Sequence, residues 1–170
     1  MKFDLNNPRT LATTAVMTAL VLGLTLIHIA QTPVGYIHLG DIAVYFTAFA
    51  FGPWVGLVAG GLGAALADVI SGWASFAPIS LIVHGAQGFV AGWLTRDRPT
   101  PARLIAGVVA GSVILIVGYF AGESLIPTFG GPAYAITEVP WNAVQELVGS
   151  LGIALYVAVA RAYPRLRHAE

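Results

Sequence analysis

The chain has 170 residues and no net charge, with 57% hydrophobic and only 9% charged side chains. Soluble domains carry about 25% charged residues, so this composition predicts a single domain whose solvent is the lipid bilayer. The absence of cysteine excludes disulfides and Cys-ligated metals, and no basic run is long enough to indicate nucleic-acid binding.

Apolar stretches of roughly 20 residues, the length that crosses a bilayer, recur along the chain. They predict an all-α integral membrane protein, one domain over residues 1–170, with six transmembrane helices at about 9–30, 40–51, 53–72, 78–95, 102–125 and 137–161. The first is interpreted as a retained span because no small-residue cleavage site follows a short apolar core. Gly52 and Pro53 separate the second and third helices, since proline breaks a helix.

The distribution of basic side chains favours six helices over five. With six, the N-terminus, the loop at 96–103 and the C-terminus share one face, and that face holds every Lys and Arg. The positive-inside rule assigns this face, and both termini, to the cytoplasm. The outer loops, at about 31–39, 73–77 and 126–136, contain neither Lys nor Arg.

The first helix carries a row of small residues at AxxxA-like spacing, Ala12, Ala15 and Ala19. Small residues allow helices in lipid to approach closely. The row is therefore either an internal interface with a neighbouring helix or a docking surface for another membrane protein, and spacing does not decide between the two.

The stretch GYIHLGD, residues 35–41, places polar side chains between two apolar runs. Its glycines allow a turn, and Asp41 fits the start of the second helix as a structural polar residue. Tyr36 and His38 are the candidates for a lid over a ligand site.

Small residues also recur at every fourth position in the third and fourth helices, which indicates close helix packing. Asp68 lies in the row formed by Gly56 and Gly60, and His84 begins a row with Gly88. Both polar side chains are therefore expected to point into the bundle, with Asp68 in a structural role.

Polar and aromatic residues gather in the outer halves of the last three helices and in the outer loops. Aromatic faces supply stacking area, and amides and carboxylates recognise ring nitrogens and hydroxyls, so the group predicts a pocket for a small ring-shaped ligand. The candidate binding residues are Tyr36, His38, Trp73, His84, Gln87, Tyr119, Glu123, Glu138, Trp141, Asn142 and Gln145. Plainer roles stay open: Glu138 as a first-turn residue, Trp73 and Trp141 as interface anchors, and His84 as a partner of a backbone carbonyl.

Motifs for enzymatic chemistry are absent. Lys2 is the only lysine, so there is no P-loop, and there is no HExxH or other local metal-binding pattern. Ser71, His84 and Asp68 could meet in space, but no GxSxG signature accompanies them. Neither an enzyme nor a cofactor is expected.

The segments GYIHLGDIAVYFTAFAFGPWVGLVAGGLGAALADVISG and HGAQGFVAGWL resemble the substrate-binding (S) components of energy-coupling factor (ECF) vitamin transporters. The combination of HLGD, GPWVG and ALAD at these intervals carries the resemblance. It is most similar to the branch for hydroxymethylpyrimidine, pyridoxine or riboflavin-like ligands.

The resemblance implies a six-helix bundle that binds one vitamin or precursor near the outer face, under a loop that here includes residues 31–39. It implies contacts from the last three helices, although no motif of the sixth can be matched residue by residue. Ala15 and Ala19 match the motif that docks on the coupling (T) subunit, which carries two ATPases. The S component then topples in the bilayer to release its ligand inside.

The sequence thus favours a substrate-capture subunit in the plasma membrane of a prokaryote, surrounded by lipid. Hydroxymethylpyrimidine or another thiamine precursor is the first expected ligand, and pyridoxine the next. Two alternatives stay open: a solitary vitamin transporter that works without ATPases, and an intramembrane enzyme that uses Asp68 and His84.

Overall fold

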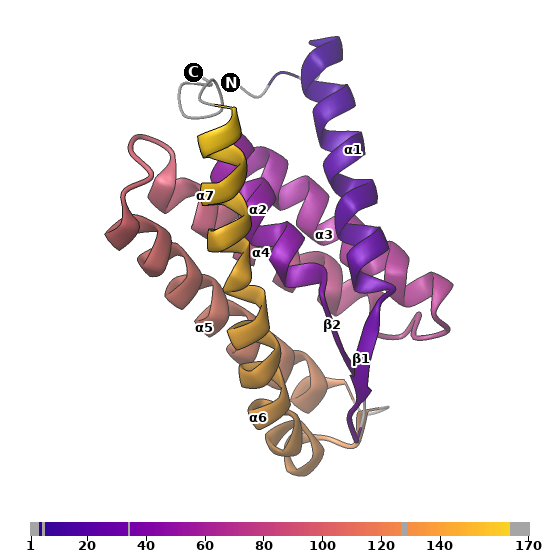
Figure 1. Cartoon of the computed structure of the whole chain (residues 1–170). Coiled ribbons are helices and arrows are strands. Elements are labelled where there is room, and N and C mark those ends of the chain that lie inside the picture. Colours follow the sequence, from indigo (N-terminus) through magenta and orange to yellow (C-terminus); the bar gives the residue numbers. More distant parts are fainter. Residues whose placement is uncertain (1–3, 5, 34, 127–128, 164–170) are drawn as a thin grey trace.

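The computed structural model describes residues 4, 6–33, 35–126 and 129–163 and consists of packed helices with one short hairpin (Figure 1). The elements are α1 (Pro8–Thr25), β1 (His28–Gln31), β2 (Tyr36–His38), α2 (Gly40–Phe51), α3 (Pro53–Ile70), α4 (Ala77–Thr95), α5 (Pro101–Leu125), α6 (Pro132–Gly149) and α7 (Leu151–Ala162). By length and composition α3, α4, α5 and the α6–α7 pair can each cross a membrane, and α2 is a shorter apolar helix.

Proline and glycine set several helix boundaries. Pro8, Pro53, Pro101 and Pro132 each begin a helix, where the missing N–H has no intrahelical partner to lose. Gly52 separates α2 from α3 with a φ of 87°, a conformation that other residues rarely adopt. The last span begins at Pro132, earlier than the expected 137, and α6 passes into α7 at Ser150.

The first helix is shorter than the sequence predicts, because α1 ends at Thr25 and not near residue 30. The chain instead forms an antiparallel hairpin in which His28 pairs with His38 and Gln31 with Tyr36. The Thr32 N–H donates to the Gly35 carbonyl at 3.0 Å, which closes the turn. Pro33 in the turn cannot continue a helix, and the β-branched Ile29 within β1 favours a strand.

Glycine rows bring α3 and α4 together as the sequence predicts. A Cβ built on Gly56 would lie 2.7 Å from the Gly88 carbonyl oxygen, and one on Gly60 the same distance from the His84 carbonyl oxygen. Asp68 and His84, which share these rows, are buried inside the bundle. Close backbone contact therefore fixes the depth at which both polar side chains sit.

The small-residue row of α1 faces away from the bundle. The helix packs on α3 through other residues: Val21 lies against Gly63, and Thr14 is buried. Ala12, Ala15 and Ala19 are all exposed. The interpretation of this row as an internal interface is thereby excluded.

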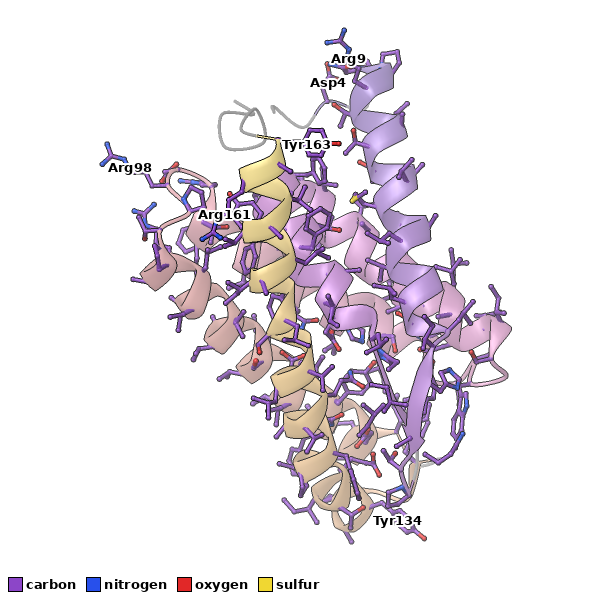
Figure 2. The ribbon with its side chains drawn as sticks, in the orientation of Figure 1. Asp4, Arg9, Arg98, Tyr134, Arg161 and Tyr163 are labelled. Atoms are coloured by element: carbon purple, nitrogen blue, oxygen red, sulfur yellow. The ribbon has the colours of Figure 1, made fainter. Side chains whose placement is uncertain are left out.

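The bundle has two unlike ends. Figure 2 shows Arg9, Arg98 and Arg161 at the end where α1 begins and α7 finishes, and Tyr134 at the opposite end beside the start of α6. The hairpin lies toward the Tyr134 end (Figure 1). These three labelled arginines therefore share one end of the bundle, as the charge pattern predicts.

Candidate functional site: a ligand pocket beneath the hairpin

A pocket lies between the hairpin and the ends of α3, α5 and α6, with about 400 Å³ of empty space when its open mouth is included. Its walls mix aromatic rings, carboxylates and amides. The lining residues are Gly35, Tyr36, His38, Asp68, Trp73, Phe76, Tyr119, Glu123, Glu138, Asn142 and Gln145.

Most of the residues proposed from sequence line this one pocket. His84, Gln87 and Trp141 do not: the first two are buried below it, and Trp141 is 41% exposed. Asp68, expected in a structural role or, in the enzyme alternative, a catalytic one, is part of the wall. Phe76 was not singled out, because in the sequence it reads as one more apolar residue before α4.

Tyr36 fastens the hairpin across the pocket. Its hydroxyl donates to Asp68 Oδ1 at 2.6 Å, and its ring lies between those of His28 and Trp73, with centroids 3.9 and 5.9 Å away. Burial and the Asp68 carboxylate raise the pKa of the Tyr36 hydroxyl far above its ordinary value. The hydroxyl therefore stays protonated and keeps its role as donor.

His38 ties the same strand to α6 and to the start of α2. Its backbone N–H donates to Gln145 Oε1 at 3.3 Å, and its Nδ1 accepts from the Gly40 N–H at 3.1 Å. Burial lowers the pKa of His38 to about 4. The ring is thus neutral near pH 7, with its proton on Nε2.

Three buried polar atoms of the lining residues have no hydrogen-bond partner in the described part of the chain: Asp68 Oδ2, Glu123 Oε2 and Asn142 Nδ2. A buried polar group without a partner costs about 1–3 kcal/mol. The three residues line the same pocket and together carry two acceptors and one donor without a partner. Neither Lys nor Arg is among the lining residues.

A second polar group lies beneath the pocket, and its members bind one another. His84 Nδ1 is 3.0 Å from Asp41 Oδ1, and Asp41 Oδ2 accepts from Gln145 Nε2 at 2.8 Å. Gln87 Oε1 lies 3.0 Å from His84 Nδ1, while Gln87 Nε2 donates to Glu146 Oε1 at 2.8 Å. These side chains are all buried. We call this group the buried network.

Glu146 extends the buried network to α5 and α2. Its Oε2 accepts from Ser112 Oγ at 2.7 Å and from the Tyr45 hydroxyl. The sequence gives Glu146 no role, because it lies one position beyond the polar face marked by Gln145. Tyr45 was hidden inside an apolar run.

The residues proposed for an intramembrane enzyme do not assemble into a catalytic group. Ser71 Oγ lies 3.5 Å from His28 Nε2, whereas His84 is paired with Asp41. Asp68 binds the Tyr36 hydroxyl. Nucleophile and base therefore do not meet as covalent catalysis requires.

The fold and the pocket define a helical membrane protein that binds a small polar ligand. Comparison with known families adds the specific class: residues 5–161 match the model of the ECF-type riboflavin transporter, S component. The chain therefore belongs to the family of ECF S components. These are substrate-binding subunits of transporters for vitamins or their precursors, not enzymes, which confirms the expected class.

Two individual proteins are similar to most of the chain. A protein of Pyrococcus woesei, named as an uncharacterized protein in the gap 3' region, is 37% identical over 115 residues, which cover 68% of this chain and 75% of the relative. The thiamine precursor transporter HmpT of Lactococcus lactis subsp. cremoris is 32% identical over 149 residues, which cover 86% of this chain and 84% of HmpT.

Two solved structures share the fold. The S component of a bacterial ECF transporter superposes with a TM-score of 0.73 at 18% identity, over 89% of this chain and 95% of the other. ThiT from Listeria monocytogenes gives 0.70 at 21% identity, over 94% and 98%. The predicted membrane bundle of six helices, with α6 and α7 counted as one, is thus confirmed.

Proposed function

We propose that this subunit captures a single-ring aminopyrimidine, of the hydroxymethylpyrimidine type, at the outer face of the membrane. The observation that carries the proposal is the set of unpartnered atoms on the pocket wall, Asp68 Oδ2, Glu123 Oε2 and Asn142 Nδ2. An amino group and a hydroxymethyl group can donate to the two carboxylates, and a ring nitrogen can accept from the amide. The similarity to the thiamine precursor transporter HmpT supports the same ligand class.

The charge of the pocket favours this ligand over anionic ones. Three carboxylates, from Asp68, Glu123 and Glu138, line the pocket without a Lys or Arg among the lining residues. A phosphate ester would meet only like charge there, so the unphosphorylated form is the substrate. Pyridoxine is the next candidate.

Capture requires the hairpin to move, and two contacts act as its latches. The Tyr36 hydroxyl donates a hydrogen bond to Asp68, and the His38 backbone N–H donates one to Gln145. When they open, the ligand enters between Trp73 and Tyr119 and stacks on aromatic faces. When they re-form, the hairpin covers the ligand. No covalent step is involved.

Release inside is proposed to need an ECF coupling subunit and its two ATPases, because this chain has no P-loop. The exposed row Ala12, Ala15 and Ala19 on α1 is the proposed docking surface for that subunit. In the proposed orientation the arginine-bearing end, with the start of α1 and the end of α7, faces the cytoplasm of a prokaryotic cell, as the positive-inside rule favours.

Uptake of radiolabelled hydroxymethylpyrimidine into vesicles, with and without the coupling subunit and ATPases, tests the proposal. We expect uptake only with the complete module and ATP. Ala15→Trp should abolish uptake and leave ligand binding intact, because it blocks only the docking row. The matched control is Val113→Trp, which adds the same bulk at an exposed position on α5, away from the row. Uptake without ATPases would instead indicate a solitary transporter.

A further inference from the structure

The buried network contains one side chain that contacts both walls of the pocket. His84 on α4 reaches Asp41, which holds Gln145 on the α6 wall. On its other edge, His84 Nε2 lies 3.2 Å from the hydroxyl of Tyr119 on the α5 wall. His84 and Asp41 are 1% and 0% exposed, so neither contacts a ligand directly.

We infer that His84 is a buried cation paired with Asp41, and that this ion pair is a positioning unit that sets the orientation of Tyr119 and Gln145 for the ligand. The inference rests on the proposed function only in taking the pocket as the ligand site. It assigns to His84 and Asp41 an indirect role that differs from the direct contact expected of His84 and from the helix-start role expected of Asp41.

The neighbours of His84 fix one of its protons. Nδ1 faces two acceptors at 3.0 Å, Asp41 Oδ1 and Gln87 Oε1, so this nitrogen carries a hydrogen. His84 is therefore a cation if its second ring nitrogen, Nε2, which faces the Tyr119 hydroxyl, also carries a hydrogen.

Charge balance indicates that Nε2 is protonated as well. The groups that face His84 are Asp41 from α2, Asp68 from α3, Glu146 from α6, Tyr119 from α5 and His38 from β2. The carboxylates among them need a nearby cation, since a buried charge without a partner is strongly destabilising.

The other basic side chains of the described residues do not supply that cation. The labelled arginines lie at the end where α1 begins and α7 finishes (Figure 2), and Arg96 and Arg103 pair with Asp97. Burial lowers the pKa of His38 to about 4, which leaves it neutral near pH 7. His84 is the remaining basic side chain of the described residues in contact with the buried network.

Protonation of His84 has a direct consequence for the pocket wall. A charged His84 donates from Nε2 to the Tyr119 oxygen, and the Tyr119 hydrogen is then free to point at Ser80 Oγ, 2.7 Å away. A neutral His84 would accept at Nε2, and the Tyr119 hydrogen would turn toward it. The ion pair thus sets the direction of the Tyr119 hydroxyl hydrogen, while Asp41 fixes the amide of Gln145.

Nitrogen NMR of histidine-labelled protein in lipid nanodiscs tests the charge without any ligand. We expect both ring nitrogens of His84 to be protonated near pH 7, with the signal assigned by its loss in His84→Gln. Asp41→Asn, which keeps the shape of the side chain, should return His84 to a neutral tautomer and shift the ring-carbon NMR signal of Tyr119. A neutral His84 in the unsubstituted protein overturns the inference.

Titration with hydroxymethylpyrimidine tests the positioning role. Asp41→Asn should weaken binding by about tenfold, the loss of one oriented hydrogen bond. The matched control is Ser112→Ala, which removes a bond to Glu146 but none to His84 and should bind within about twofold of the unsubstituted protein. Equal affinity and an unchanged Tyr119 signal in Asp41→Asn overturn the positioning role. If the unsubstituted protein binds no pyrimidine, the proposed ligand fails, and the two NMR signals still decide this inference.

Discussion

The pocket wall and the buried network use the same kinds of side chain in opposite ways. In the buried network, both oxygens of Glu146, both polar atoms of Gln87 and both nitrogens of His84 have hydrogen-bonding contacts. Asp41 Oδ2 accepts from Gln145, and Asp41 Oδ1, which forms no hydrogen bond, lies 3.0 Å from His84 Nδ1 as an ion pair. On the pocket wall, Asp68, Glu123 and Asn142 each keep a buried atom without one. The two regions are adjacent, and Gln145 belongs to both.

This contrast separates a structural role from a binding role. Polar atoms that satisfy one another stabilise the bundle and leave nothing for a ligand. Polar atoms left open at a pocket lower stability and mark where a ligand supplies the missing partner. Substitutions in the pocket should therefore change affinity, and substitutions in the buried network should mainly change stability, with Asp41 and His84 affecting both.

The largest expected effect is on ligand affinity. The double substitution Asp68→Asn with Glu123→Gln removes both charged acceptors and should weaken binding of hydroxymethylpyrimidine by at least about 100-fold, because hydrogen bonds to charged groups contribute about 1.5–3 kcal/mol each. Isothermal titration calorimetry measures the change. The melting temperature should stay the same or rise. Tight binding by the double variant would show that these carboxylates are not the ligand's acceptors.

A change in the buried network should act on stability instead. Gln87→Leu leaves Glu146 Oε1 without its donor, so the free energy of unfolding should fall by about 1–3 kcal/mol while affinity stays within about threefold. Denaturant unfolding in detergent measures the first quantity and calorimetric titration the second. The opposite pattern, lost affinity at unchanged stability, would restore the direct ligand contact that the sequence suggested for Gln87.

Protonation of His38 in the hairpin should make the free energy of unfolding depend on pH, with an effect of intermediate size. The unfolded chain has a His38 pKa of 6.5 and the folded protein one of about 4, so below about pH 6.5 the unfolded state takes up a proton that the folded state excludes. Stability is therefore full above pH 6.5 and falls toward pH 4, with about 2 kcal/mol lost by about pH 5. Thermal melts across this range measure the loss.

His38→Asn is the control for this prediction, because the asparagine oxygen can still accept from the Gly40 N–H but does not titrate. Between about pH 7 and pH 5, the free energy of unfolding of this variant should fall by about 2 kcal/mol less than that of the unsubstituted protein. Parallel pH profiles for the two proteins would assign the acid sensitivity to other groups.

The smallest effect is expected at Trp141, which the sequence placed in the pocket and the structure leaves 41% exposed outside it. Trp141→Ala should change affinity by less than about twofold. The comparison is Trp73→Ala, which removes a ring from the pocket wall and should weaken binding by about tenfold. Fluorescence titration suits both variants. An equal loss in the two would return Trp141 to the site.

The parts of this fold that were predictable depend on strong, local physical constraints. Low charge content and the one-sided arginines indicate a membrane bundle, because charged groups are costly in lipid. The row of small residues containing Gly56 predicts the α3–α4 contact, because only small residues let the two helix backbones approach so closely.

What could not be predicted depends on contacts between distant residues. Helix α1 ends where His28 begins to pair with His38 in the hairpin. The spacing of apolar residues along a helix contains no information about this pairing with a later segment. Gln145 and Glu146 are adjacent and similar, yet one reaches the pocket and the other lies below it. Asp41 and His84 find each other across the bundle, so neither alone reveals an ion pair.

Native mass spectrometry can test whether the pocket selects a pyrimidine and holds it through Asp68 and Glu123. The purified protein is incubated with an equal mixture of hydroxymethylpyrimidine, pyridoxine and riboflavin, alongside the double variant Asp68→Asn with Glu123→Gln. We expect the unsubstituted protein to carry one bound molecule with the mass of the pyrimidine, and the double variant to carry none. Bound riboflavin, or a ligand that the double variant retains, would contradict it.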